Sequence, residues 1–514
     1  MAEDELFRGR GGAVAAPNAL AAQAGLDLIH LGGTAVDAAI AAMLVTYVSE
    51  PGIVSALGGA FVNIWPDGGD PIVVDGNCEM PGRGLPSTRF GGGLREVDLD
   101  YGGGITIYAG AGSAATPGSF KAFEEAHARH GRASWADIMA PAIEIGRRGF
   151  RLGAAAASYL GIVGQALYGF DPQTRKAHFV GDHPATVGTM LTVPELADTL
   201  DLLASEGFSL LYGGDLGRRV ADHLQANDGL ITLEDLSAYE ARVRPATVDR
   251  VGPWRLATNP PPSIGGPVLA TMLRLIQRRG ATADDVLQVQ REVLTYRAGS
   301  LDAAADLEIA GADLLRALEG NDLATLPTST DTAHVSAVDS RGNACALTSS
   351  AGYSSGVTVP GTGLVLNNCL GEPELNRRGI HAVAPGTRLA SNMAPTTGQD
   401  DDGAMLAIGS PGADRITTAL MQVLAAHCLS DVALQDAINA PRAHVSVDFS
   451  SRSIRLETEP DKALEAAAAR IDAPHVGHAR HAMYFGGVAA AKRRPDGDLQ
   501  AAADPRRASA TAIG

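Results

Sequence analysis

A threonine at the open end of a predicted hairpin is the residue with the clearest chemical potential in this sequence. Two strand-like runs, 332–339 and 344–350, flank a short turn whose last residue is Gly342. A glycine at that place is typical of a three-residue hairpin loop, because the backbone there is left-handed. Register counting across the loop places Thr332 opposite Ser350, and directly opposed side chains lie about 4.5–5.5 Å apart at Cβ. The spacing therefore predicts a pair of hydroxyls at the end of two strands.

Threonine is a poor nucleophile at neutral pH unless a base lies beside its hydroxyl. One solution is to make it the first residue of a chain, so that its own α-amine removes the hydroxyl proton. A free α-amine titrates at about 7.7–8.0, close to the pH at which a general base must work. We therefore predict a precursor that is cut between Asp331 and Thr332. The alternative is an ordinary strand residue, because threonine favours strands and most threonines at strand starts carry out no chemistry.

The segment Thr332-Ala333-His334, with the later turn Gly342-Asn343, resembles the start of the small subunit in the gamma-glutamyltransferase (glutathione hydrolase) family. This family belongs to the N-terminal-nucleophile hydrolases. Further matches run along most of the chain, at 32–39, 115–120, 135–150, 260–266, 440–444 and 503–507. The resemblance implies self-cleavage into a large subunit, 1–331, and a small catalytic subunit, 332–514, which are intertwined in one domain.

The resemblance also implies roles for residues around the nucleophile. Ser350 aligns with a family threonine that hydrogen-bonds the amine of the nucleophile and assists self-cleavage. The oxyanion hole aligns with the backbone N–H groups of Gly412 and Ala413, in a Gly-Ser-Pro-Gly loop. Backbone donors need no side chain, so Ala413 suits this role if its φ is negative. The alternative for this loop is a helix entry capped by Ser410, and we expect His334 to be a structural histidine.

The substrate-binding positions implied by the resemblance differ from the family pattern. Cys78 replaces the arginine that pairs with the α-carboxylate of a gamma-glutamyl donor, and Gly352 replaces an asparagine at the same end of the substrate. Glu372 replaces the aspartate that holds the donor α-amine, and it carries the charge one methylene further out. Ser391 and Asn392 stand where the family has two serines. Loss of a bidentate cation is not conservative, so we expect a rebuilt clamp.

The missing cation has three candidate replacements in the sequence, Arg83, Arg388 and Arg415. The sequence does not distinguish between them. The connection from Glu372 to Ser391 is also shorter than in family members that fold a loop over the donor. We therefore expect a pocket that is open to larger amides.

Length and composition place these residues in a large globular chain. Its 514 residues are 45% hydrophobic, which is enough for a core, and its net charge of −17 disfavours nucleic acid and anionic membranes as partners. No apolar run approaches the roughly 18 residues of a membrane span, and the acidic start lacks the apolar core of a signal peptide. The four cysteines lack a Cys-x-x-Cys spacing, so we expect free thiols and a cytoplasmic location.

The elements that position the site are predicted to include both helices and strands. Periodicity predicts helices at 18–48 (broken at Gly32-Gly33), 119–130, 192–206 and 414–427. Alternating runs predict strands at 333–339, 344–350, 404–408 and 453–457. These patterns indicate an α+β fold. The family resemblance narrows it to a four-layer αββα sandwich, with helices outside two antiparallel sheets and with Asp37 in a structural role.

Together these features favour a self-processing, gamma-glutamyltransferase-like amidohydrolase. It would transfer a gamma-glutamyl or similar acyl group from a small-molecule amide to water or an amine, through an acyl-threonine. Two alternatives stay open: an acylase of the same fold with another donor, such as a dicarboxylyl group on a bulky amine, and an unprocessed, non-catalytic homologue. We expect the two cleaved subunits to stay associated, and we expect no cofactor, metal, nucleic-acid or membrane partner.

Overall fold

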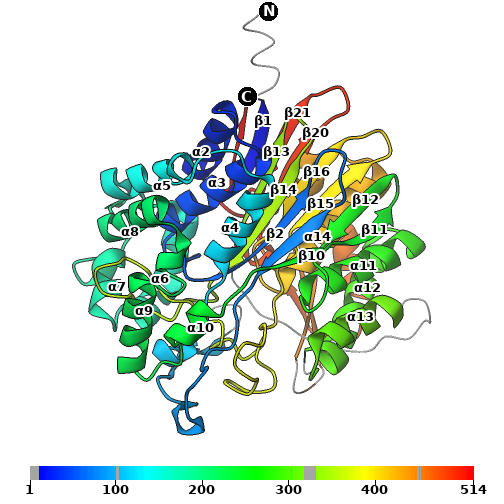
Figure 1. Cartoon of the computed structure of the whole chain (residues 1–514). Helices are drawn as coiled ribbons and strands as arrows, with labels where there is room; N and C mark the ends of the chain where they lie inside the picture. The colour runs from blue at the N-terminus through cyan, green and yellow to red at the C-terminus, as the bar shows by residue number, and fades with distance from the viewer. Residues whose placement is uncertain (1–10, 100–103, 303, 318–331, 449–450, 452) are drawn as a thin grey trace, which may run out of the picture.

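Two large antiparallel sheets face each other at the centre of the computed structural model, which describes residues 11–99, 104–302, 304–317, 332–448, 451 and 453–514 (Figure 1). Within these residues the strand order of the first sheet is β10-β3-β2-β14-β13-β1-β22, and that of the second is β11-β12-β15-β16-β20-β21. The strands of the first sheet are β1 (Gly12–Ala16), β2 (Gly59–Trp65), β3 (Ile72–Gly76), β10 (Arg242–Pro245), β13 (Ala333–Asp339), β14 (Ala344–Ser350) and β22 (Ala510–Ile513). Those of the second are β11 (Thr247–Val251), β12 (Trp254–Thr258), β15 (Thr396–Asp400), β16 (Met405–Gly409), β20 (Ala489–Arg493) and β21 (Leu499–Ala503).

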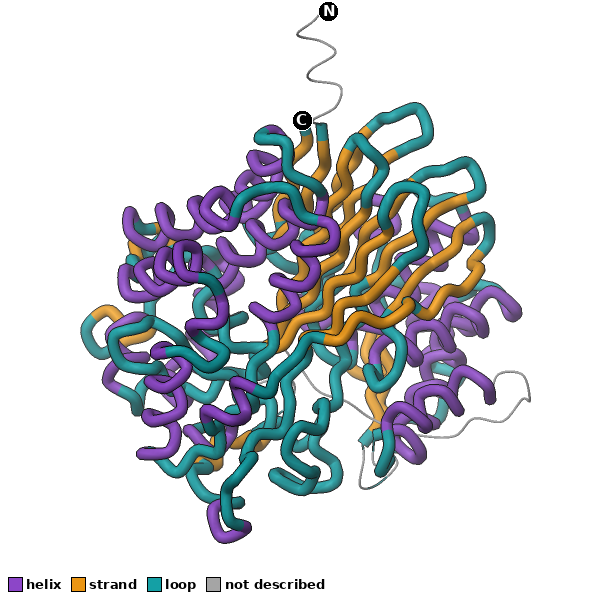
Figure 2. Tube along the Cα trace, in the orientation of Figure 1, coloured by secondary structure: helices purple, strands orange, loops and turns teal. Residues whose placement is uncertain are grey.

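Helices cover the outer face of each sheet, as Figure 2 shows, so the chain is the predicted four-layer αββα sandwich. The helices on the side of the first sheet are α2 (Ala19–His30), α3 (Ala35–Ser49), α4 (Ser119–His130), α5 (Trp135–Arg148), α6 (Ala154–Val163), α7 (Pro172–His178), α8 (Pro194–Glu206), α9 (Asp215–Ala226) and α10 (Leu233–Ser237). Those on the side of the second are α11 (Gly265–Arg279), α12 (Ala283–Tyr296), α13 (Leu307–Ala317), α14 (Arg415–Leu424), α15 (Leu434–Asn439) and α16 (Lys462–Ala468).

Small side chains fill the space between the two sheets. This inner cluster consists of Ala13, Trp65, Ala257, Val338, Ala344, Ala346, Met405, Ala407 and Ala491. Six of its nine members are alanines, so the sheets approach closely, while larger side chains form a separate core under each helical layer. The alanine richness of the sequence therefore serves the contact between sheets.

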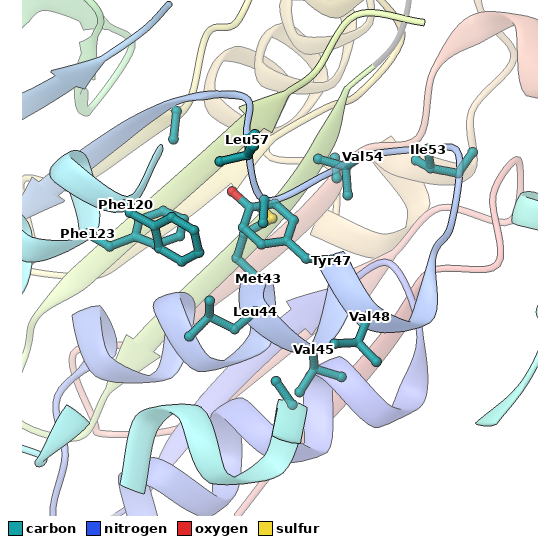
Figure 3. Close-up of a cluster of buried hydrophobic side chains, with 14 of the residues drawn as sticks. Met43, Leu44, Val45, Tyr47, Val48, Ile53, Val54, Leu57, Phe120 and Phe123 are labelled. Carbon is teal, nitrogen blue, oxygen red and sulfur yellow. The ribbon is translucent and has the colours of Figure 1, made fainter. Parts of the chain in front are cut away.

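The helix α3 is buried along its whole length and connects the first sheet to its helical layer. Figure 3 shows Tyr47 of this helix beside Leu57 and near Phe120 and Phe123 of α4. The Tyr47 hydroxyl lies 2.8 Å from the Ser349 hydroxyl of β14. This contact joins α3 to the strand that ends at Ser350.

Asp37 has the structural role that the sequence predicts. Its carboxylate completes a capping box with Thr34 at the start of α3. The same carboxylate accepts hydrogen bonds from the backbone N–H groups of Arg132 (2.9 Å) and Ala133 (3.2 Å), in the loop before α5. Asp37 therefore holds two helices of one layer together.

Most predicted elements lie where the periodicity placed them, with shifts of a few residues at their ends. One strand has a different setting. The run predicted at 453–457 forms β18 (Ile454–Thr458), which pairs with β17 (Ala443–Val447) and β19 (His475–Gly477) in a small separate sheet. Short two-stranded ribbons are made by β4 (Arg95–Leu99) with β5 (Ile105–Ala109), β6 (Phe150–Arg151) with β9 (Met190–Leu191), and β7 (Phe179–Val180) with β8 (His183–Pro184). Among the described residues, none of the helices is long and apolar enough to cross a membrane.

Candidate functional site

The central hairpin of the first sheet has the predicted register. The backbone N–H of Asp339 donates to the Asn343 carbonyl at 3.1 Å, and Gly342 in the turn has a φ of +98°. Ala333 of β13 pairs with Ser349 of β14. One further step in this register sets Thr332 opposite Ser350. The Thr332 side chain is buried, with 3% of its surface exposed.

Gly352 lies directly beside Ser350, and Glu372 lies beside Gly352. The Ser350 hydroxyl accepts the N–H of Gly352 at 3.2 Å, and Gly352 has a φ of +59°. A Cβ atom on Gly352 would lie 2.3 Å from Oδ1 of Asn368 and 2.8 Å from Oε1 of Glu372. The Glu372 carboxylate therefore uses space that a side chain at 352 would need. The two departures from the family pattern, Gly352 and Glu372, fit each other.

Cys78 reaches the site with its backbone, while its side chain points into an apolar cluster. Gly59 of β2 pairs with Ser350, and a Cβ on Gly59 would lie 2.8 Å from the backbone nitrogen of Cys78. The Cys78 side chain is fully buried with Met80 and Leu370. The Cys78 thiol, together with burial, holds the pKa of the neighbouring Cys369 thiol well above its usual value. Position 78 therefore supplies no cation for a substrate carboxylate.

Ser391 and Asn392 come shortly after Leu389, a residue whose backbone is hydrogen-bonded to that of Cys78. The N–H of Leu389 donates to the Cys78 carbonyl at 2.9 Å, and the Ser391 carbonyl accepts the N–H groups of Ile264 and Gly265, each at 3.0 Å. Both side chains are buried, with exposed fractions of 4% and 5%. The structure thus fixes this pair between the end of β3 and the start of α11.

The three arginines that could replace the missing cation each have carboxylate partners. Arg388 pairs with Glu79 at 3.1 Å and with Asp75 at 3.4 Å, and it lies 4.6 Å from the centre of the Tyr239 ring. Arg83 contacts the carboxylates of Glu79 and Asp235, each at 3.4 Å.

Arg415 forms an ion pair with Asp414 and donates from Nε to the Tyr484 carbonyl at 3.0 Å. All three side chains therefore serve internal ion pairs. We do not assign any of them to the substrate.

The predicted oxyanion loop begins against β13. A Cβ on Gly409, at the end of β16, would lie 2.3 Å from Cε1 of His334. Gly412 has a φ of +120° and Ala413 a φ of +59°. Ala413 therefore does not meet the condition of a negative φ, because the chain makes a left-handed turn here. Left-handed backbone costs a residue with a Cβ roughly 1–2 kcal/mol, so surrounding contacts must hold the loop.

Those contacts come from Asp414 and Arg415. Nε2 of His444 lies 3.0 Å from the Asp414 carboxylate, and Nδ1 of His444 lies 3.1 Å from the Thr418 hydroxyl. The Arg415 guanidinium lies over the Tyr484 ring, 4.7 Å from its centre. Although burial opposes the charge, Arg415 and His444 hold the pKa of Asp414 below its usual range. We call Asp414, Arg415, His444 and Tyr484 the loop anchor.

Ser410 does not cap a helix. Its hydroxyl donates to the Pro411 carbonyl at 2.7 Å and accepts the N–H of Gly487 at 3.2 Å. The helix α14 begins at Arg415, with Asp414 as the preceding residue. The alternative role for this loop, a helix entry capped by Ser410, is therefore wrong.

His334 is a structural residue, as expected. Its two ring nitrogens each lie 2.8 Å from a hydroxyl, that of Thr348 and that of Ser336. Burial lowers the pKa of His334 to about 3, so the ring is neutral at neutral pH. The ring supports the contact between β13 and β16.

The sequence interpretation missed the loop anchor, although two of its residues stood in recognised segments. His444 ends the Ala-Pro-Arg-Ala-His match, and Arg415 was considered only as a cation for substrate. In the described part of the chain, no group of three or more His, Cys, Asp and Glu residues could hold a metal ion. The site is built from hydroxyls, one carboxylate and backbone N–H groups.

A protein-family model described as gamma-glutamyltranspeptidase matches residues 21–514. The chain belongs to this family. It is 30% identical to the acylase ACY 1 proenzyme of Pseudomonas sp. (strain V22), over 96% of this chain and 92% of that protein. It is 28% identical to the glutathione hydrolase proenzyme of Escherichia coli (strain K12), over 98% of this chain and 92% of that protein.

Two solved structures share the fold. Cephalosporin acylase from Bacillus halodurans superposes with a TM-score of 0.80, over 98% of this chain and 96% of that one, at 22% identity. Gamma-glutamyltranspeptidase from Pseudomonas nitroreducens, complexed with L-DON, superposes with a TM-score of 0.50 at 28% identity. That match covers 60% of this chain and 95% of that one.

Proposed function

We propose that this chain is a self-processing amidohydrolase in which Thr332, freed as a chain start, is the nucleophile. The observation that carries the proposal is the register of the central hairpin, which sets Thr332 opposite Ser350 beside Gly352 and Glu372. In this arrangement the α-amine of Thr332 takes the proton of its own hydroxyl. In this proposal the Ser350 hydroxyl hydrogen-bonds that amine.

The proposed reaction then has two steps. The Thr332 oxygen attacks the carbonyl carbon of an amide, and the N–H groups of Gly412 and Ala413 stabilise the oxyanion. The C–N bond breaks, and the amine leaves with the proton that the α-amine had taken. Water or a second amine then attacks the acyl-threonine and releases the acyl group, which restores the free hydroxyl.

The donor class has two candidates, a gamma-glutamyl group and another acyl group. The buried, apolar setting of Cys78 favours the second, because it removes the cation that the family resemblance assigns to the α-carboxylate. Both names occur among the relatives, as acylase and as glutathione hydrolase proenzymes. We therefore propose an acylase-like amidohydrolase with a rebuilt donor pocket.

The experiment is to trap the acyl-enzyme. Purified protein is mixed with gamma-glutamyl, glutaryl and butyryl p-nitroanilides, quenched in acid and analysed by mass spectrometry. We expect an acyl mass increment on the fragment 332–514 with at least one donor, and none in Thr332→Ala. An active wild type that carries the adduct on another residue would contradict the assignment of Thr332. A wild type that is never cut and hydrolyses no amide would instead favour the non-catalytic homologue.

A further inference from the structure

A pocket of about 220 Å³ lies among the helices that cover the first sheet. It is lined by the end of α3 and the chain that follows it, by α7, by the start of α8 and by the loop after β14. Figure 3 shows three of its lining residues, Tyr47 and Val48 near the end of α3 and Val54 where the chain turns back toward β2. The exposed residues Lys176 and Thr192 also line it, so the pocket opens to solvent. We call it the outer pocket.

The outer pocket lies on the other face of the first sheet from the proposed nucleophile. Tyr47 lines the pocket, and its hydroxyl lies 2.8 Å from the Ser349 hydroxyl, so Ser349 points toward the helical layer. Ala346 of the same strand belongs to the inner cluster between the sheets. Because successive residues of a strand point to opposite faces, Ser350 faces the second sheet, together with Thr332 opposite it. The first sheet therefore separates the outer pocket from the proposed nucleophile.

His178 of α7 supplies a hydrogen-bond acceptor to the outer pocket. Its Nδ1 lies 2.7 Å from the Thr174 carbonyl, which can only accept, so Nδ1 carries a proton. Burial lowers the pKa of His178, although the Thr174 carbonyl opposes the shift, so the ring is neutral at neutral pH. In a neutral ring the other nitrogen, Nε2, holds a lone pair. Within the described ranges Nε2 has no hydrogen-bond partner, and His178 lines the pocket.

A second polar group and apolar walls complete the lining. The Ser55 hydroxyl is buried and has no hydrogen-bond partner in the part of the chain that the structure describes. Buried polar groups nearly always have a partner, so this hydroxyl marks a place where a ligand atom can bind. The ring of Tyr168 stacks on His178 with the ring centres 4.7 Å apart. The apolar walls are formed by Val48, Pro51, Val54, Leu196 and Val365.

We propose that the outer pocket binds a small aromatic molecule of one ring that carries a hydroxyl or N–H donor. The donor bonds to Nε2 of His178, Ser55 makes a second polar contact, and the ring packs on the apolar walls. Mostly apolar linings with a few polar groups are typical of small-molecule sites. An apolar cavity of about 150 Å³ holds benzene, so the 220 Å³ of the outer pocket suits one substituted ring. This inference goes beyond the proposed function and does not depend on Thr332.

A pair of fluorinated probes tests the hydrogen bond to His178. In 4-fluorophenol and 4-fluorotoluene a hydroxyl and a methyl group of similar size stand at the same place, and ¹⁹F NMR titration measures the binding of each. We expect the purified wild type to bind 4-fluorophenol about fivefold or more tightly than 4-fluorotoluene, the usual effect of one hydrogen bond. His178→Phe keeps an aromatic ring and removes the acceptor, so it should abolish this preference. Equal binding of the two probes by the wild type would overturn the proposal.

A variant that fills the mouth of the pocket shows where the probes bind. Ala177 of α7 is half-buried and lines the pocket, so Ala177→Phe should weaken both probes about tenfold or more. The matched control is Ala310→Phe, which makes the same change at a half-buried alanine of α13 in the other helical layer and should leave both unchanged. This pair keeps the test open if His178→Phe does not fold. Unchanged binding in Ala177→Phe would place the probes elsewhere and overturn the proposal.

Steady-state kinetics tests the separation of the outer pocket from the nucleophile. In the wild type, 4-fluorophenol should leave the KM of an anilide donor unchanged, because the first sheet lies between the two sites. Competitive inhibition that disappears in Ala177→Phe would place the pocket in the path of the substrate and overturn its assignment as a separate site. Failure of Thr332 as the nucleophile would show in the acyl-enzyme experiment, whereas the NMR titrations would still judge the outer pocket.

Discussion

Ala413, which we propose as the second oxyanion donor, has a left-handed backbone and directly follows the left-handed Gly412. The sequence predicted which residues form this loop, because the Gly-Ser-Pro-Gly motif is local. It did not predict the φ of Ala413, because the following residues, Asp414 and Arg415, are held by His444 and Tyr484, which are distant in the sequence. Cys78 shows the same limit. The sequence shows that Cys78 replaces the arginine of the family pattern, but the burial of its side chain depends on Met80, Leu370 and their neighbours.

Adding a methyl group at Gly412 should reduce activity far more than removing one at Ala413. In Gly412→Ala the new Cβ would lie 2.8 Å from the Gly486 backbone, so the loop must shift and an oxyanion donor is misplaced. We expect kcat to fall by about 10²-fold, the usual effect of losing one such donor. Ala413→Gly removes a Cβ from a left-handed residue and should keep turnover within about threefold of wild type. Steady-state kinetics on the same amide checks both, and a fully active Gly412→Ala would remove Gly412 from the oxyanion hole.

At the scale of elements, the site is where the ends of several strands and one helix meet. In the hairpin β13–β14, Thr332 directly precedes β13 and Ser350 ends β14, while β16 leads into the proposed oxyanion loop and α14. The alternation of residues predicted β13, β14 and β16 well, because each is a regular strand in a buried sheet. Alternation does not name the partner of a strand, so the run that became β18 could not be placed in its small separate sheet. That sheet matters, because β17 carries His444 to the loop anchor.

The loop anchor should stabilise the protein through its buried charges. Asp414→Asn keeps the size of the side chain but leaves the buried Arg415 without its ion pair. We expect the free energy of unfolding to fall by about 1.5–3 kcal/mol, the usual contribution of a charged hydrogen bond, together with a lower kcat. The control is Asp313→Asn, which removes an exposed ion pair with Arg316 on α13 and should cost less than about 1 kcal/mol. Denaturant titration measures both, and equal stability of the two variants would contradict the role of the anchor.

At the scale of the whole molecule, the fold rests on close contact between two sheets and on buried polar links to the helical layers. One such link is made by Glu50 at the end of α3. Its carboxylate accepts a hydrogen bond from the side-chain amide of Asn18 at 2.7 Å. Burial raises the pKa of Glu50 from 4.5 to about 7, although Asn18 and Arg507 oppose the shift. The layered architecture followed from the family resemblance, whereas composition alone indicated only an α+β protein. Links such as Asn18–Glu50 join segments far apart in the chain and need the folded structure to be seen.

The raised pKa of Glu50 gives stability a defined pH dependence. Between pH 4.5 and about 7 the folded protein keeps a proton that the unfolded chain has lost, so this group contributes stability below pH 4.5 that disappears as the pH rises through about 7. Glu50→Gln keeps the hydrogen bond from Asn18 without a titrating group. Relative to wild type, the variant should gain about 1.4 kcal/mol per pH unit across that window. Denaturation at pH 4.5, 6 and 7 measures the difference, and a constant offset at all three values would contradict the raised pKa.

The most direct test of the account is the mass and the N-terminal sequence of the purified chains. We predict two fragments that co-purify, residues 1–331 and 332–514, with the second beginning Thr-Ala-His-Val. Thr332→Ala should give one uncut chain, and the control Thr328→Ala should be cut like the wild type. A cut at another bond, or an active wild type that remains a single chain of 514 residues, would contradict the central claim that Thr332 is the nucleophile.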